Sequence, residues 1–180
     1  MIDSRPRSYI LGALLLVAMV AWAVWLICHR KNLVDYMAEE ASARPPLPLC
    51  SWVPMTSKDV VKLGFSLDGG SVWTFQKTAL LAFRTKGRTP WYVDIGVVAV
   101  VGDGITMSAD GGAPHTVPKV ERLPRGEVVR LPLSLHTKDG VHVVLTRIPD
   151  PKRPNGTEQR WLGVAMAHIR ACDSLQHPNG

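Results

Sequence analysis

Residues 78–104 read TALLAFRTKGRTPWYVDIGVVAVVGDG, in which a loop containing glycine and proline separates two apolar runs. Each run has the length and the β-branched or aromatic content of a strand, and the closing Gly-Asp-Gly is a turn sequence. The same pattern of short apolar runs divided by Gly, Pro, Asn and Asp extends from Cys50 onward. This pattern predicts a mainly β fold, an antiparallel, jelly-roll-like β-sandwich.

The strands of this sandwich are expected between the glycine- and proline-rich turns, with no helix after residue 50. Residues 109–120 contain two glycines and two prolines, so they are expected to be irregular. The expected strands are residues 60–65, 71–75, 78–84, 91–101, 127–135, 141–148 and 160–170.

One hairpin can be predicted in register. Apolar side chains alternate along residues 131–135 and again along residues 141–145. A three-residue turn at 138–140, with Gly140 left-handed, keeps both apolar sets on the inward face. That register places His136 opposite His142 on the other face. The two histidines are a weak candidate for a metal site, because zinc needs four ligands or three and a water. An ordinary solvent-facing pair is favoured.

An uncharged stretch, YILGALLLVAMVAWAVWLIC, occupies residues 9–28. As a helix it would be about 30 Å long, enough to cross the hydrocarbon core of a bilayer. The apolar region of a cleaved signal peptide is usually only about 7–15 residues long, so a retained anchor is favoured over a signal peptide or a core helix. The sequence predicts a cytoplasmic N-terminus at 1–8, a transmembrane helix at 9–28, and a juxtamembrane helix end with a proline-rich spacer at 29–49.

The cysteines indicate on which side of the membrane the sandwich lies. Basic residues flank the apolar stretch on both sides, so the positive-inside rule predicts the membrane orientation only weakly. Cys50 and Cys172 bracket the β-rich region, and a disulfide between them would require an oxidising compartment. Two buried free thiols are the alternative. The favoured reading is a sandwich at 50–173 on the outer side of the membrane, followed by a flexible tail at 174–180.

Charge and motifs narrow the function classes. The net charge of +6 and the pI near 9.5 suggest an acidic neighbour, such as anionic lipid, a charged glycan or nucleic acid. A membrane anchor makes nucleic acid the least expected of these. The sequence contains no GxSxG, P-loop or HExxH motif. Asp94 and Asp103 are a poor carboxylate pair for glycoside hydrolysis, because turn aspartates usually cap backbone. We therefore expect no enzyme and no cofactor.

Aromatic residues are the best candidates for binding. Trp52, Trp73, Trp91, Tyr92 and Trp161 lie in the predicted β region, where aromatic side chains are often part of the core. Trp91 follows Pro90 beside a basic loop, which favours a surface position. The predicted contact surface for a glycan or a partner consists of Trp91, Tyr92, Arg84, Lys86 and Arg88.

The runs GFSLDGGSVWTFQKTALLAF (64–83), IPDPKRPNGTEQR (148–160) and WLGVAMAHIR (161–170) resemble the β-sandwich domains of unknown function attached to bacterial membrane glycosyltransferases of surface-polysaccharide synthesis. Phe65 stands where that pattern has an opening tryptophan. The resemblance covers residues 62–170 and implies a jelly-roll-like domain, similar to a carbohydrate-binding module, in a bacterial envelope. It supplies no active-site residue.

Together these observations predict a single-pass protein of the bacterial inner membrane with its sandwich in the periplasm. It would assist synthesis, export or modification of an envelope polysaccharide by contacting the glycan or a multi-span membrane enzyme such as a glycosyltransferase. The alternative is a structural subunit of a membrane complex, in which the helix packs on partner helices and the sandwich caps them.

Overall fold

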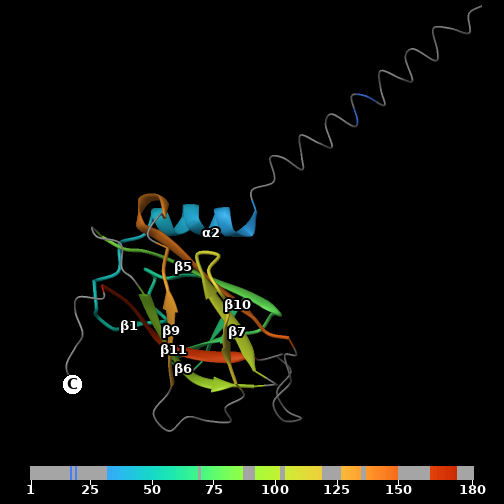
Figure 1. The fold of residues 1–180 in the computed structure, drawn as a ribbon, viewed down its shortest axis with the longest axis vertical. Helices are drawn as coiled ribbons and strands as arrows, with labels where there is room; N and C mark the ends of the chain where they lie inside the picture. The colour runs from blue at the N-terminus through green and yellow to red at the C-terminus, as the bar shows by residue number, and fades with distance from the viewer. Residues whose placement is uncertain are drawn as a thin grey trace, which may run out of the picture. The chain divides into compact units, whose positions relative to one another are not determined.

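A computed structural model describes residues 17, 19, 32–68, 70–86, 92–101, 104–118, 127–134, 137–149 and 163–173. The chain divides into two compact units, Met1–Leu33 and Val34–Gly180, and the second contains the strands (Figure 1). The predicted membrane segment lies outside the described residues except for Val17 and Met19, which are helical and exposed. Within the described ranges, no helix is both long and apolar enough to cross a bilayer.

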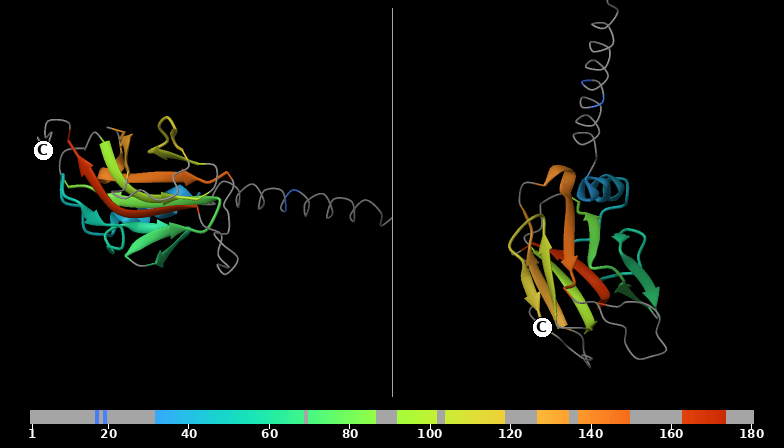
Figure 2. Two further views of the ribbon diagram at one scale, coloured as in Figure 1. Left: turned by 90° about the horizontal axis from the view of Figure 1, so that it is seen from below. Right: turned by 90° about the vertical axis from the view of Figure 1, so that its right-hand side faces the viewer.

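The described strands of the second unit form two antiparallel sheets, which confirms the expected mainly β, sandwich-like fold. The six-stranded sheet has the order β3 (Phe65–Asp68), β4 (Ser71–Thr74), β11 (Val164–Cys172), β6 (Tyr92–Val100) and β9 (Glu127–Pro132), and β1 (Val53–Pro54) also pairs with β11. The five-stranded sheet has the order β2 (Val61–Leu63), β5 (Thr78–Arg84), β10 (Val141–Arg147), β7 (Ile105–Ala109) and β8 (His115–Val117). The two sheets face each other as layers (Figure 2).

A single apolar core lies between the sheets. Successive side chains of a strand point to opposite faces, so every second residue contributes to this core. On β6 the inward residues are Val93, Ile95 and Val97, and on β5 they are Leu81 and Phe83, all fully buried. The alternate residues of β6 therefore lie on the outer face of the six-stranded sheet.

The helix α2 (Leu33–Ser42) covers the outer face of the five-stranded sheet (Figure 1). Its buried residues, Met37 and Ala41, pack against Leu80, Ala82 and Val141. The central strand β5 is consequently apolar on both faces, whereas β10 turns Val141, Val143 and Leu145 toward α2 and His142, Val144 and Thr146 toward the core. The segment 29–49, expected to contain the end of a juxtamembrane helix and a proline-rich spacer, thus supplies a helix that packs on the sheet, and also a β-bridge from Leu47 to Thr85.

Removing the side chain of Met37 tests whether α2 belongs to the folded unit. Met37→Ala is expected to lower the free energy of unfolding by about 2 kcal/mol, because it leaves a cavity between α2 and the sheet. Denaturant unfolding of the full chain in detergent measures the change. The matched control, Tyr36→Ala, alters a neighbouring side chain that is 53% exposed and should change stability by less than about 0.5 kcal/mol. Equal stabilities of the two variants would contradict the packing of α2.

The predicted hairpin between residues 131–135 and 141–145 is wrong. β9 pairs with β6, whereas β10 pairs with β5 and β7, so the connection between them passes from one sheet to the other. Leu131 faces the core, but Val141 lies beneath α2. The turn itself has the expected left-handed Gly140 (φ +67°), and Asp139 is also left-handed (φ +59°). Alternation alone did not predict which sheet each strand joins.

Two further strands differ from the expectation. Residues 109–120 were expected to be irregular, yet residues 115–117 form β8, an edge strand paired with β7. The last strand begins at Val164 and continues to Cys172, two residues beyond the expected end. The extension matters for the site, because it carries Arg170 and Cys172 beside β6.

Candidate functional site

His142, one of the two histidines considered as a weak metal candidate, does not face solvent. His142 is fully buried and faces the core, where its ring lies 5.5 Å from that of Phe83. Its Nδ1 is 2.7 Å from Asp110 Oδ2, and Asp110 also accepts hydrogen bonds from the backbone N–H groups of Val143 and Ser134. His136 lies outside the described residues. No group of three potential metal ligands occurs in the described part of the chain. The prediction that the two histidines face solvent is therefore wrong for His142. Its contact with Asp110 instead links β10 to the residue that follows β7.

The predicted contact surface is divided between two faces of the sandwich. Arg84, at the end of β5, donates a hydrogen bond from Nη1 to the carbonyl of Ser42 in α2, at 3.3 Å. It therefore lies on the outer face of the five-stranded sheet, whereas Tyr92 lies on that of the six-stranded sheet. Lys86 is exposed, and Trp91 and Arg88 lie outside the described residues. The structure does not bring Arg84 and Tyr92 together.

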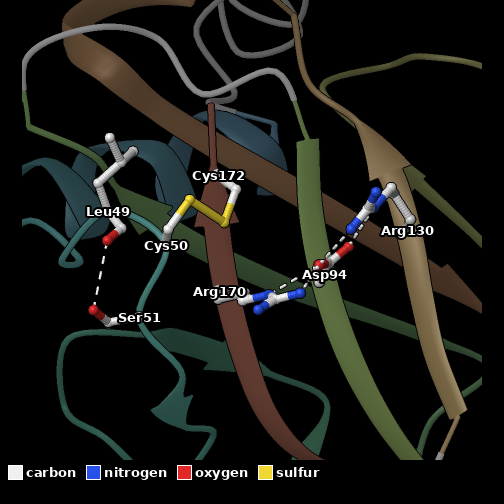
Figure 3. Close-up of a disulfide and its surroundings, with 7 residues drawn as sticks. All are labelled: Leu49, Cys50, Ser51, Asp94, Arg130, Arg170 and Cys172. Atoms are coloured by element: carbon white, nitrogen blue, oxygen red, sulfur yellow. Dashed lines mark hydrogen bonds and ion pairs between the residues drawn. A yellow bond between two sulfur atoms is a disulfide. The ribbon is translucent and has the colours of Figure 1, made fainter. Parts of the chain in front are cut away.

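A row of three charged residues crosses the outer face of the six-stranded sheet. Asp94 on β6 lies directly opposite Arg170 on β11 and Arg130 on β9. Residues that are directly opposite in neighbouring antiparallel strands have their side chains side by side, so the carboxylate lies between the two guanidinium groups. Figure 3 shows both arginines pointing toward Asp94 from the flanking strands.

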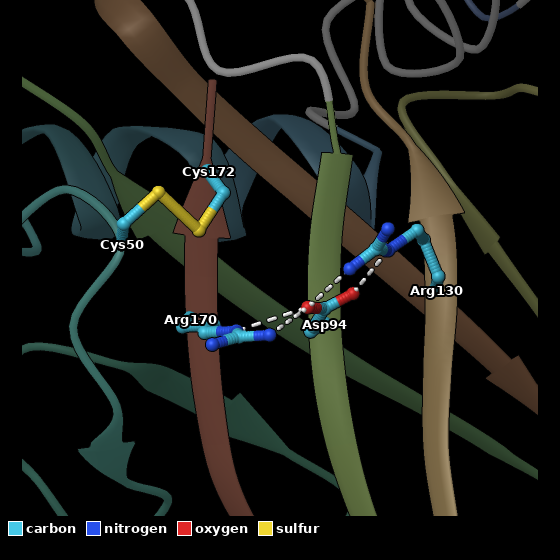
Figure 4. A network of polar contacts seen from close by, with 5 residues as sticks. All are labelled: Cys50, Asp94, Arg130, Arg170 and Cys172. Atoms are coloured by element: carbon cyan, nitrogen blue, oxygen red, sulfur yellow. Dashed lines mark hydrogen bonds and ion pairs between the residues drawn. A yellow bond between two sulfur atoms is a disulfide. The ribbon is translucent and has the colours of Figure 1, made fainter. Parts of the chain in front are cut away.

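The carboxylate of Asp94 is shared by the two arginines (Figure 4). Arg130 donates from Nε to Oδ1 at 2.8 Å and from Nη2 to Oδ2 at 3.0 Å. Arg170 donates from Nε to Oδ2 at 2.9 Å, and its Nη2 lies 2.9 Å from the same oxygen. The Asp94 side chain is 0% exposed, whereas that of Arg130 is 47% exposed. The hydrogen bond to Asp94 raises the pKa of Arg130 above its usual value.

Each arginine also lies over an aromatic ring. The Cζ atom of Arg130 is 3.9 Å from the ring centroid of Tyr92, and that of Arg170 is 4.4 Å from the ring centroid of Trp52. Both distances are in the range of a cation–π contact. Trp52 remains 41% exposed. We call this surface the arginine face, and it comprises Trp52, Tyr92, Asp94, Arg130, His168 and Arg170.

The Cys50–Cys172 disulfide holds one side of the arginine face (Figure 3). It joins the segment before β1 to the last residue of β11, as the sequence predicted, and the two Cα atoms are 4.5 Å apart. Cys50 N–H also donates to the Ala171 carbonyl at 2.8 Å. Beyond Trp52, β1 begins with Val53 opposite Ile169. Trp52 is therefore fixed beside Arg170 by a covalent bond on one side and strand pairing on the other.

A second row of outward residues adjoins the charged one. Gly96 lies opposite both His168 and Val128. His168 is exposed, its ring centroid is 6.4 Å from that of Trp52, and Val128 is 51% exposed. Because Gly96 has no side chain, this row leaves backbone uncovered between its two flanking side chains. The sheet surface next to the arginine face therefore has no bulky side chain at its centre.

This geometry is suited to binding rather than to proton transfer. A general acid or base must exchange a proton with a reacting group, whereas both oxygens of Asp94 already accept hydrogen bonds from arginine. Asp103, considered from the sequence as the second carboxylate of a hydrolytic pair with Asp94, lies outside the described residues. The arginines, by contrast, present donors and positive charge on an exposed surface.

Sequence reasoning predicted Tyr92 as a contact residue but missed the charged row of the arginine face, although a signal for this row was present. Asp94, Arg130 and Arg170 each have an apolar residue on either side within a strand, in YVDIGVVAV, EVVRLP and VAMAHIRAC. A charge at such a position is expensive to bury unless it is paired. A search for opposite charges on different strands would have suggested the pairing, but not its register.

Comparisons with known proteins do not place the chain in a family. No protein-family model and no curated protein matches it. Among solved structures, a CBM35 domain from Paenibacillus barcinonensis is 8% identical, with a TM-score of 0.42, and the match covers 69% of this chain and 99% of that one.

Two enzymes give similar values over a part of their length. A family two carbohydrate esterase from Cellvibrio japonicus is 13% identical, with a TM-score of 0.41, and the match covers 66% of this chain. A glycoside hydrolase family 43 arabinoxylan arabinofuranohydrolase from Bacillus subtilis is 12% identical, with a TM-score of 0.42 and 72% coverage. The chain spans only 32% and 28% of the lengths of these two enzymes. With TM-scores below 0.5, none of these likenesses assigns a function.

Proposed function

We propose that this protein is a non-catalytic binding protein whose arginine face contacts a glycan. The observation that carries the proposal is the exposed ring of Trp52, held in place beside the guanidinium of Arg170, which shares Asp94 with the guanidinium of Arg130. Sugar rings have apolar C–H faces that can stack on an indole ring, and their hydroxyl groups accept hydrogen bonds from N–H donors. The arginine face offers both kinds of contact on one surface.

Fixed side chains favour such a contact. Binding normally costs conformational entropy for each side chain that becomes ordered, and long arginine side chains lose much of it. Here Arg130 and Arg170 are already held by Asp94 and by an aromatic ring, and Trp52 is held by the disulfide and β1. The surface is thus organised before a ligand arrives.

Truncating Trp52 tests the proposal. Trp52→Ala is expected to weaken glycan binding by the full chain in detergent about tenfold, which corresponds to about 1.4 kcal/mol. Affinity electrophoresis and titration calorimetry against a panel of bacterial envelope polysaccharides would measure it. Tyr36→Ala, which removes an exposed aromatic ring on α2, should bind as the wild type does.

Two results would count against a glycan-binding role. Absence of binding to every polysaccharide in the panel would remove the proposed function, and equal binding by Trp52→Ala would remove the arginine face from it. The experiment also separates this proposal from a structural subunit of a membrane complex. Such a subunit has no need to bind glycan through Trp52.

The proposed setting is the bacterial inner membrane, with residues 9–28 as the anchor and the sandwich in the periplasm. Support comes from the length of the uncharged segment and from the Cys50–Cys172 disulfide, which is favoured in oxidising compartments. In that setting the protein would assist the synthesis, export or modification of an envelope polysaccharide. A partner such as a membrane glycosyltransferase is suggested by the sequence resemblance only.

A further inference from the structure

We infer that the glycan is acidic and that its carboxylate or sulfate group binds at the row formed by Arg170, Asp94 and Arg130. This inference rests on the proposed function and narrows its ligand. It follows from the charge balance of the row, from the way the arginines are held, and from the exposure of Arg130.

The row carries an excess of positive charge. Two guanidinium groups share one carboxylate, so one positive charge is left without a counter-charge inside the row. The ion pairs with Asp94 use the Nε and Nη2 groups of both arginines, which leaves the Nη1 groups outside these pairs. Because the Arg130 side chain is 47% exposed, a ligand can reach it from solvent.

The buried carboxylate acts as an orienting group beneath the ligand site. Asp94 is fully buried, and it fixes the plane of the Arg130 guanidinium through two parallel hydrogen bonds. The ring of Tyr92 lies against the guanidinium of Arg130, and that of Trp52 lies against the guanidinium of Arg170. Guanidinium groups held in this way suit planar or tetrahedral oxyanions better than a mobile lysine does.

An anionic sugar gains more from this row than a neutral sugar does. Hydrogen bonds between charged partners are roughly twice as strong as those between neutral groups. A hydroxyl group on a neutral sugar would accept a hydrogen bond from arginine but would not neutralise the excess charge. The net charge of +6 on the whole chain adds attraction at longer range.

Matched polymers test the inference directly. The full chain in detergent is titrated with polygalacturonate and with the same polymer after reduction of its carboxyl groups, and with dextran sulfate against dextran. At least one acidic polymer should bind at least tenfold more tightly than its neutral counterpart at about 50 mM NaCl. The difference should shrink strongly at about 500 mM NaCl, where charge interactions are screened.

The outcomes separate the inference from the proposed function. Equal affinity for acidic and neutral polymers would overturn the inference and leave glycan binding intact. Absence of binding to all of these polymers, together with absence of binding to the envelope panel, would overturn both. Preference for the carboxylated or for the sulfated polymer would identify the anionic group.

Introducing a negative or a positive charge at Val128 tests where the anionic group binds. Val128 is 51% exposed and lies two residues from Arg130 on the same face of β9, about 7 Å along the strand. Val128→Glu is expected to weaken acidic-polymer binding several-fold, and the matched Val128→Lys to strengthen it, so that the ratio of acidic- to neutral-polymer affinity follows the sign of the added charge. Neither variant removes a buried contact. Identical acidic-polymer binding by both variants would show that the anion binds elsewhere, and would overturn the inference.

Arg130→Lys separates orientation from charge. Lysine keeps the positive charge but loses the paired hydrogen bonds to Asp94 and the flat contact with Tyr92. We expect this variant to bind acidic polymers at least fivefold more weakly than the wild type, at equal net charge. Wild-type affinity would show that charge alone is sufficient, and would contradict the role of the oriented guanidinium.

Discussion

Asp94→Asn is expected to lower the free energy of unfolding by about 3 kcal/mol. Removing one partner of a buried ion pair leaves the other charge without compensation, at a cost of about 3–5 kcal/mol. The lower end applies here, because Arg130 is half exposed and water can hydrate it, whereas Arg170 is only 17% exposed. Asparagine has nearly the same shape as aspartate, so the loss reports the charge and not a cavity.

Denaturant unfolding of the full chain in detergent measures the loss at Asp94. Val128→Asn is the matched control, since it changes an exposed residue on the same outer face and should alter stability by less than about 0.5 kcal/mol. Combining Asp94→Asn with Arg170→Gln should cost less than the sum of the two single changes, because the partners act as one network. A loss below about 1 kcal/mol for Asp94→Asn would contradict the shared ion pair.

Replacing both Cys50 and Cys172 with serine is expected to cost about 4 kcal/mol. The two residues are 122 positions apart in sequence, and a disulfide that closes a long loop removes much conformational freedom from the unfolded chain. Measured costs of removing native disulfides are about 2–5 kcal/mol. The same change should weaken glycan binding, because the segment that holds Trp52 loses its covalent link to β11.

Two measurements check the disulfide. Non-reducing mass spectrometry of the protein purified from cells should show Cys50 joined to Cys172, and reductant should lower the stability of the wild type to that of the double variant. Cys28→Ser, which removes the third cysteine, is the control and should leave stability unchanged. Finding Cys50 and Cys172 both alkylated without reductant would contradict the bridge, and with it the proposed periplasmic location.

Parts of the fold that depend on local pattern were predictable from the sequence. β5 has the predicted bounds, 78–84, and the cysteine pair was identified from its position at the two ends of the β region. The partner of β10 was not predictable in the same way. The alternating apolar residues of this strand, Val141, Val143 and Leu145, lie beneath α2, whereas His142, Val144 and Thr146 face the core, so alternation indicated the wrong face as inward.

The candidate site was harder to predict because it depends on sheet membership. Arg84 and Tyr92 are close in sequence, but β5 and β6 belong to different sheets, so their side chains lie on opposite outer faces. Asp94, Arg130 and Arg170 are far apart in sequence and become neighbours only through the order β11-β6-β9 and its register. Spacing along the chain contains no information on that order.

The position of β11 has a consequence for how the molecule folds. Among the described strands it comes last along the chain, yet it pairs with β1, β4 and β6 in the middle of the six-stranded sheet. Before it is available, neighbours in sequence such as β3 with β4 and β7 with β8 can pair, but the sheet lacks its centre. Such late, long-range pairing slows folding and exposes unpaired strand edges to aggregation. Assembly of the arginine face therefore requires that β11 has joined the six-stranded sheet.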